Sequence, residues 1–390
     1  MDSKCLHDSI IQGIRQNALR RPRRIVITDG EDERAIEAVV RLCQASHDNY
    51  NQDNTNSSES QSPNLPNFPN LQFILLGSEQ KISRNPLFTK KLPQQVLVKN
   101  PIDDSLHKGF AKLYFELRDE KGKPVSLSHA EEQLKENAYF GAMLVRLGYA
   151  DGMIGGSSIP TAKLLKAGID VIGMNAHSKV VSGSFLMFLP RPLPGGQQML
   201  VLADCAVVPN PDAEQLADIA LNTVQTASNV IAMEPVVAFV SFSTKGSANY
   251  AGLEKLKQAL SILRERAPNL RADGELQIDA ALVPEIGERK DPNGFVRGRA
   301  NVLIFPDLNS GNIAYKLVER VGGAKALGVV LSGFAKPVND LSRGCSTEDI
   351  MDMICVTALQ SEGDASTVAS ASNEGGAPNA SNDLRGRMEA

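Results

Sequence analysis

The sequence predicts an α/β protein built from three-layer α/β/α domains with mostly parallel sheets. Three segments carry the pattern behind this prediction: a short apolar run, a polar or glycine-containing loop, and then apolar residues at helical spacing. Such alternation of strands and helices is typical of parallel sheets with helices packed on them. The length of 390 residues predicts two or three domains, at roughly 150 residues per domain.

The first of these segments starts with residues 24–28, whose apolar run predicts a buried strand. Residues 29–32 form the loop that follows it. The next apolar residues recur at helical spacing and predict a helix; they are Ala35, Ile36, Val39, Val40 and Leu42.

The other two segments show the same order later in the chain. Residues 199–203 predict a strand, and residues 210–212 (NPD) predict the start of a helix with a proline near its first turn. Residues 302–305 predict another strand, followed by a loop at 306–311 and a helix over 312–321. In such sheets ligands bind beyond the carboxyl ends of the strands, so these loops are the first place to look for a site.

Composition narrows the classes of function. The net charge of -4 argues against nucleic acid as a partner, because its phosphates require a basic face. The five cysteines are scattered and none lies in a CxxC motif, so neither a disulfide framework nor a zinc site is predicted, and a cytoplasmic protein fits best. Neither a secretory signal nor a bilayer-spanning run of roughly 18 apolar residues is visible, so we expect no membrane partner.

Two segments are poor in apolar residues. Residues 47–70 are rich in Asn, Ser, Asp and Pro, and residues 361–390 are rich in Ser, Ala, Gly and Asn. Because such segments bury too little apolar surface to offset the entropy of ordering, we expect a mobile surface insertion and a disordered tail.

The segment with the most chemical groups is 331–346, in which a strand ends, a polar loop follows and a helix starts. Ser346 is a favourable N-cap and Asp349 falls at the third helical position, so by spacing alone both are capping residues. The loop ahead of them holds three further polar residues: Asn339, Ser342 and Arg343. A loop that ends at a helix N-terminus is a natural anion site, and Arg343 adds a bidentate phosphate donor.

Three further segments contain polar or glycine-rich loops. Residues 305–320 contain a polar loop and then a helix, with Arg320 near the helix end, where the helix dipole favours a solvated cation. Residues 241–247 (SFSTKGS) form a plausible phosphate loop, although the Walker A spacing is absent. The glycines within 151–158 either let the backbone approach a ligand closely or simply form a turn.

Several of these motifs, taken together, resemble those of the phosphate acetyltransferases (phosphotransacetylases). The most specific is KPVNDLSRGCS at 336–346, and four others match in the right order: ADCAVVPNP at 203–211, SFSTKGS at 241–247, GELQIDAALVP at 274–284 and FPDLNSGNIAYK at 305–316. The resemblance covers residues 6–360 apart from the polar insertion.

The resemblance implies a fold of two α/β domains with the active site in the cleft between them. Domain I would comprise residues 1–176 and 333–360, and domain II residues 177–332. It also implies a homodimer and a reversible reaction in which acetyl-CoA and phosphate give acetyl phosphate and CoA. Coenzyme A is a substrate in this reaction, which requires no further cofactor and no metal.

The resemblance also assigns roles to residues. Ser342, Arg343 and Asp349 fall where the family keeps its catalytic serine, arginine and acidic residue. The candidate substrate-binding residues are Arg320, Arg118, Lys166 and Asn339. We expect the CoA thiolate to attack the acetyl carbonyl directly, with Asp349 assisting proton removal and Arg343 stabilising negative charge. Cys345 is expected to pack under the loop, because no histidine lies near it in the sequence to activate it as a nucleophile.

The chain departs from the family pattern in three places. Ile159 replaces a histidine, Lys166 replaces an arginine, and residues 118–122 read RDEKG where the family has RKHKG. Lysine keeps the charge but loses the planar fork of arginine, so the change is not neutral at a bidentate site.

These departures leave two alternatives open. One is an acyltransferase for a longer acid such as butyrate, and the other is a weakly active homologue that binds acetyl-CoA or acetyl phosphate. A dehydrogenase on a similar scaffold is disfavoured, because no GxGxxG motif follows the first strand.

Overall fold

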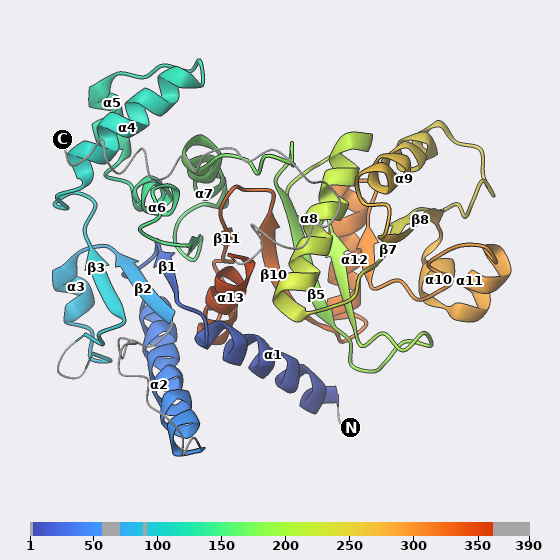
Figure 1. The fold of residues 1–390 in the computed structure, drawn as a ribbon, viewed down its shortest axis with the longest axis horizontal. Helices are drawn as coiled ribbons and strands as arrows, with labels where there is room; N and C mark the ends of the chain where they lie inside the picture. Colours follow the sequence, from blue (N-terminus) through green and yellow to red (C-terminus); the bar gives the residue numbers. More distant parts are fainter. Residues whose placement is uncertain (1–2, 57–70, 89–91, 362–390) are drawn as a thin grey trace. The chain divides into compact units, whose positions relative to one another are not determined.

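The structure, a computed structural model, describes residues 3–56, 71–88 and 92–361 (Figure 1). The chain divides into two compact units. Unit 1 gathers Met1–Gly13 and Met174–Ala335, and unit 2 gathers Ile14–Gly173 and Lys336–Ala390. Helix α1 (Ser3–Leu19) contributes to both.

Unit 2 is built on a five-stranded parallel sheet in the order β11-β4-β1-β2-β3. The strands are β1 (Arg23–Ile27), β2 (Leu71–Leu76), β3 (Val96–Lys99), β4 (Gly152–Gly155) and β11 (Val338–Asp340). The chain passes from β1 to β2 and β3 on one side, and then returns to place β4 on the other side of β1. The strand order therefore reverses between β1 and β4, and in open α/β sheets ligands bind at such a switch point.

Helices cover both faces of this sheet. A Cβ added at Gly152 would meet Thr357 of α13 (Thr347–Gln360), whereas one added at Gly155 would meet Leu164 of α7 (Thr161–Ala167). Strand residues an odd number apart point to opposite faces, so α13 and α7 lie on opposite sides of β4. Helix α2 (Glu33–Asn56) packs beside α13, and α6 (Asn137–Arg146) packs beside α7.

The remaining helical segments of unit 2 are short or peripheral. They are α3 (Glu79–Ser83), α4 (His107–Glu120), α5 (Leu127–Gln133) and the π-helical turn η1 (Gly168–Ile172). The turn η1 directly follows α7, so α6, α7 and η1 form one packed group.

Unit 1 is built on a six-stranded mixed sheet in the order β10-β5-β6-β9-β7-β8. Its strands are β5 (Ser182–Phe188), β6 (Met199–Ala203), β7 (Val236–Val240), β8 (Arg271–Leu276), β9 (Val302–Ile304) and β10 (Lys325–Ser332). Strands β6, β9, β7 and β8 are parallel, whereas β5 runs antiparallel to β6 and β10 antiparallel to β5.

Side chains on both faces of the unit 1 sheet are buried. Leu200, Leu202 and Leu303 belong to the core cluster against which Tyr315 and Val318 of α12 (Leu308–Arg320) pack. The alternate residues of the same strands, such as Val201 and Ile304, are also fully buried. Parallel strands buried on both faces require helices on both faces, which here also include α8 (Ala213–Ile231) and α9 (Glu254–Arg266).

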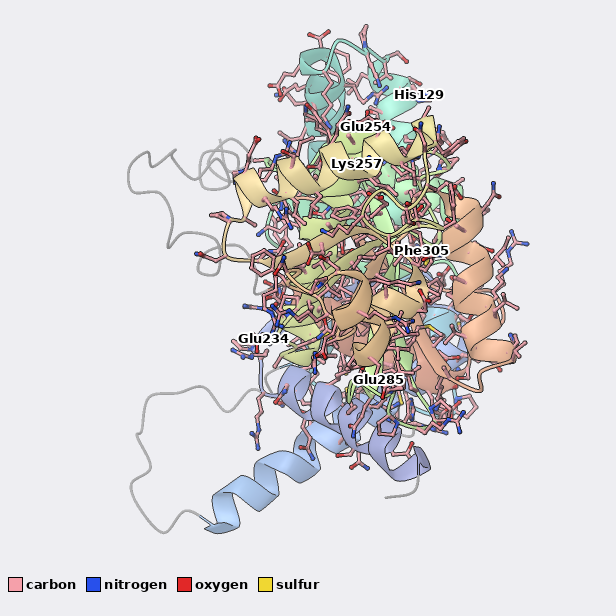
Figure 2. All side chains as sticks on the ribbon, turned by 90° about the vertical axis from the view of Figure 1, so that its right-hand side faces the viewer. His129, Glu234, Glu254, Lys257, Glu285 and Phe305 are labelled. Carbon is pink, nitrogen blue, oxygen red and sulfur yellow. The ribbon has the colours of Figure 1, made fainter. Side chains whose placement is uncertain are left out.

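Helix α9 illustrates how sequence sets a covering helix. Leu256, Leu260 and Leu263 recur at helical spacing and are buried, while Glu254 and Lys257 lie on the exposed side (Figure 2). The smaller helices of unit 1 are η2 (Ala251–Leu253), α10 (Ile278–Leu282) and α11 (Pro284–Lys290).

The predicted fold class is confirmed: both units are α/β, with sheets that are wholly or mostly parallel. Helix α12 begins four residues earlier than predicted, because Asp307 caps it and accepts a hydrogen bond from the Ser310 backbone N–H. Helix α2 runs on through residues 47–56, the first part of the expected insertion, since extending a helix costs less than starting one. Residues 57–70 of that insertion, and residues 362–390 of the expected tail, lie outside the described residues. Within the described ranges, no helix combines the length and apolarity needed to span a bilayer.

Candidate active site in unit 2

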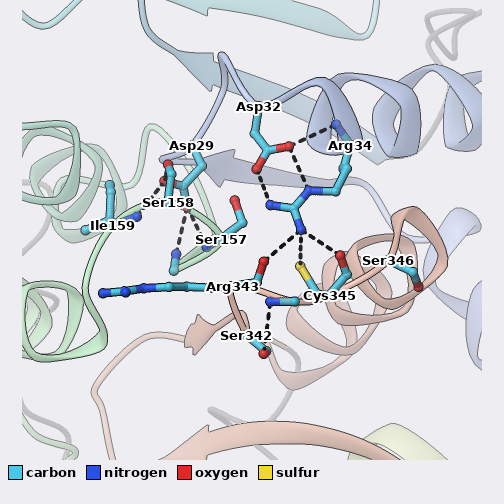
Figure 3. A network of polar contacts seen from close by, with 12 residues as sticks. Asp29, Asp32, Arg34, Ser157, Ser158, Ile159, Ser342, Arg343, Cys345 and Ser346 are labelled. Carbon is cyan, nitrogen blue, oxygen red and sulfur yellow. Dashed lines mark hydrogen bonds and ion pairs between the residues drawn. The ribbon is translucent and has the colours of Figure 1, made fainter.

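The polar loops of unit 2 meet at the carboxyl ends of three neighbouring strands. Residues 28–32 follow β1, residues 156–160 follow β4 and residues 341–346 follow β11. Because β1, β4 and β11 are adjacent and parallel, these loops lie along one edge of the sheet, at the switch point (Figure 3).

Asp29 fixes the loop after β4. Its carboxylate accepts hydrogen bonds from the backbone N–H groups of Gly156 (2.7 Å), Ser157 (3.2 Å) and Ile159 (3.2 Å), and from the hydroxyl of Ser158 (Figure 3). Asp29 is only 4% exposed, so the carboxylate needs these donors to offset its loss of hydration. This residue therefore sets the shape of the turn in which Ile159 lies.

Arg34 ties the loop after β1 to the loop after β11. Its guanidinium pairs with Asp32 (2.7 Å) and donates to the carbonyl oxygens of Arg343 (2.9 Å) and Cys345 (2.7 Å). Burial alone would raise the pKa of Asp32, but the hydrogen bonds from Arg34 and Ser157, with the charge of Arg34, together outweigh it and lower that pKa. The backbone that carries Arg343 is thus held by a charged pair.

The predicted catalytic residues come together at the start of α13. Ser346 and Asp349 form a capping box, in which the Asp349 carboxylate accepts from the Ser346 backbone N–H and hydroxyl, both at 2.8 Å. Ser342 and Arg343 immediately precede this cap, and both are exposed. The Arg343 guanidinium has no hydrogen-bond or ion-pair partner within the described residues, and it points away from Arg34 (Figure 3).

Cys345 is poorly placed for nucleophilic chemistry. Its side chain is buried, and burial raises the pKa of the thiol despite the nearby Arg34. A protonated, buried thiol is a poor nucleophile, so Cys345 packs beneath the loop as the sequence suggested.

Asp340, at the end of β11, is a second buried carboxyl group at this edge. Thr161 donates to its Oδ2 (2.7 Å), while its Oδ1 is buried without a hydrogen-bond partner in the described part of the chain. Burial, with Asp29 nearby, raises the pKa of Asp340 to about 6. Asp340 is therefore able to change protonation state near neutral pH.

The four predicted substrate-binding residues come from four different elements. Asn339 is fully buried and donates to Thr357 and Gln360 of α13, so it holds β11 to that helix. Arg118 pairs with Asp170 (2.7 Å) in the group formed by α4, α6 and η1. Lys166 is exposed in the last turn of α7. Arg320 belongs to unit 1, where its side chain is 81% exposed beside Glu319.

The structure does not support a phosphate loop at residues 241–247. The backbone N–H of Gly246 (2.7 Å) and the hydroxyl of Ser243 (3.1 Å) donate to the carboxylate of Glu275, and Lys245 pairs with Asp273 (2.9 Å). The donors that would bind a phosphate are thus already occupied by internal carboxylates.

Sequence reasoning missed the roles of Asp29, Asp32 and Arg34. It identified their loop only as the turn after a strand, although five charged residues within residues 29–34 are a signal of a site. Among the described residues, no group of three His, Cys, Asp or Glu side chains is arranged to hold a metal ion.

Comparisons with known proteins agree with the motifs. The family model described as phosphate acetyl/butaryl transferase matches residues 69–358. A phosphate acetyltransferase from Thermoanaerobacterium thermosaccharolyticum is 39% identical over 354 residues, which cover 91% of this chain and 100% of that protein. The Bacillus subtilis phosphate acetyltransferase is 36% identical, with 86% and 94% coverage.

Solved structures give the same answer for the fold. A phosphotransacetylase from Streptococcus pyogenes superposes with a TM-score of 0.78 at 34% identity, covering 91% of this chain and 98% of that one. The family match spans well over half of the chain, and the relatives are matched along nearly their whole length. The chain belongs to the phosphate acetyl/butaryl transferase family.

Proposed function

We propose that this chain catalyses the reversible transfer of an acetyl group between coenzyme A and inorganic phosphate. Family membership supports this, as do relatives named phosphate acetyltransferase that match it over most of its length. The alternatives, a longer acyl group or a weakly active homologue that binds acetyl-CoA or acetyl phosphate, gain no support from these relatives.

One observation of the site carries the proposal. The carboxylates of Asp29 and Asp32 are satisfied by internal donors, whereas the Arg343 guanidinium is exposed and has no partner among the described residues. A free arginine at the start of a helix is suited to a phosphate or an oxyanion, because both the fork and the helix dipole favour negative charge. The site is therefore electrostatically prepared for an anionic substrate.

The reaction follows from this arrangement. In the direction of acetyl-CoA formation, the CoA sulfur attacks the acetyl carbonyl carbon and a tetrahedral oxyanion forms. The carbon–oxygen bond to phosphate then breaks, so the electron pair leaves on phosphate and the new thioester remains. Arg343 would stabilise the oxyanion and the leaving phosphate, and Ser342 would donate a hydrogen bond to one of them.

Asp349 is the candidate acceptor for the thiol proton. One of its oxygens is engaged with Ser346, and the other has no partner among the described residues. A carboxylate is a weak base for a thiol, so we expect Asp349 to act together with Arg343, which lowers the cost of forming the thiolate.

We also propose that the protein forms a homodimer. An apolar stripe on α12 supports this, because Ile313, Leu317 and Val321 are four residues apart and more than half exposed (58%, 54% and 80%). Residues at this spacing share one helix face, and exposed apolar patches are common at subunit contacts.

The first test is CoA release from acetyl-CoA by the purified protein, followed by thiol colour with and without phosphate. We expect release that depends on phosphate, with acetyl phosphate as the second product. If protein that still binds CoA releases none, the proposal fails and a binding protein is the better account. The same assay with butyryl-CoA would test the acyl preference.

A further inference from the structure

The π-helical turn η1 is held by basic side chains from two neighbouring helices. Lys121, just after α4, donates to the carbonyl oxygens of Ile169 (3.2 Å) and Asp170 (2.9 Å). Arg146, at the end of α6, donates to the carbonyl oxygens of the next two residues (2.9 and 3.5 Å). The side chains of Lys121 and Arg146 therefore donate to main-chain carbonyl oxygens that water usually satisfies.

The Asp170 carboxylate lies among these cations. Arg118 donates to its Oδ1 at 2.7 Å, and the Tyr139 hydroxyl donates to its Oδ2 at 3.2 Å. The side chains of Arg118 and Asp170 are only 14% and 12% exposed. The Nε of Arg118 is also buried and has no hydrogen-bond partner in the described part of the chain. This N–H group is thus a donor that a further acceptor could satisfy.

The charges of this cluster do not balance. Four cations, Arg118, Lys121, Lys123 and Arg146, lie in this cluster, and two carboxylates, Asp170 and Glu120, lie near them. Burial lowers the pKa of Lys121, and repulsion from Arg146 lowers it further. Burial also lowers the pKa of Arg146. Crowded, partly desolvated cations favour the binding of an additional or stronger anion.

We propose that Asp170 is an internal counter-ion, which occupies the phosphate-binding donors of Arg118 until a substrate phosphate group displaces it. The inference rests on the proposed function and on the substrate-binding roles that the family resemblance implies for Arg118 and Lys166. Lys166 lies four residues before Asp170, at the end of α7, and is exposed. A phosphate dianion carries more charge than the carboxylate and matches the arginine fork, so it competes well for these donors.

The test is Asp170→Asn, which removes the negative charge and keeps an oxygen for Tyr139 or Arg118. We expect the KM for the phosphate-bearing substrate to fall about tenfold, because the internal competitor is weakened, while kcat changes little. A fall when phosphate is varied at saturating acetyl-CoA would assign the site to inorganic phosphate. A fall when acetyl-CoA is varied at saturating phosphate would assign it to a phosphate group of coenzyme A.

The matched control is Asp119→Asn, which makes the same charge change at an exposed neighbour of Arg118. If neither KM falls in Asp170→Asn while its melting temperature drops, Asp170 is only structural and the inference is wrong. Calorimetric binding of phosphate and of CoA to both proteins separates this outcome from failure of the proposed function. If phosphate or CoA binds more tightly to Asp170→Asn while the wild type shows no turnover, the proposed reaction is wrong but the counter-ion role of Asp170 stands.

Discussion

The hydrogen bonds to Asp29 predict a large local effect when its side chain is removed. In Asp29→Ala, the backbone N–H groups of Gly156 and Ser157 lose their acceptor inside a buried environment. Each unsatisfied buried donor costs about 1–3 kcal/mol, so these two together cost about 4 kcal/mol. The Ser158 hydroxyl and the Ile159 N–H are only partly buried, so water can replace Asp29 as their acceptor. Their loss therefore adds no further cost in free energy.

Hydrogen exchange read by mass spectrometry measures this effect locally. A loss of about 4 kcal/mol corresponds to about a thousandfold faster exchange of the amides of residues 156 and 157. Turnover should fall as well, because the turn faces the loop that carries Arg343. The control is Asp103→Ala, which removes an exposed carboxylate elsewhere in unit 2. Unchanged exchange of the 156–157 amides in Asp29→Ala would refute the role given to this carboxylate.

Five further substitutions test the rest of the site and the assembly. Arg343→Ala and Ser342→Ala should each lower turnover about a hundredfold without changing the melting temperature, because both side chains are exposed; full activity in both variants would remove the proposed anion site. Asp349→Asn should lower turnover and leave calorimetric CoA binding unchanged, whereas a lower melting temperature alone would mean that this residue only caps α13. Asp340→Asn should raise the melting temperature at pH 8 but hardly at pH 4. The folded pKa of Asp340, about 6, lies above its ordinary 3.8, so the wild type loses stability as pH rises through that window, by about 1.4 kcal/mol per unit; identical pH profiles would contradict this. Leu317→Asp should convert the proposed dimer to a monomer in light scattering, and a monomeric wild type would contradict the dimer.

Sequence patterns predicted those strands and helix caps that depend on residues close together in the sequence. Strand β6 occupies the predicted range of residues 199–203, because it is a short apolar run that is buried on both faces. The capping box of Ser346 and Asp349 is also as predicted, since its two hydrogen bonds join residues three apart. The antiparallel placement of β5 and β10 was not predicted, because strand direction depends on connections that periodicity does not record.

The site was predictable only in part, for the same reason. Ser342 and Arg343 could be found from their motif, but the contacts of Arg34 with the 343–345 loop join residues about three hundred positions apart. Lys245 shows the opposite error. Its loop has the composition of a phosphate site, yet its donors are occupied by the carboxylates of Asp273 and Glu275. These two residues come from a later strand, so the loop sequence does not reveal them.

The clamp on residues 156–159 also bears on mutational tolerance. Only the main chain of Ile159 takes part in the contacts with Asp29, so the shape of the turn does not depend on which side chain stands at position 159. The fold of the turn is therefore compatible with an isoleucine where the family pattern has a histidine. A saturation library at 159 would then sample substrate preference on a constant backbone, whereas changes at Asp29 would alter the turn itself.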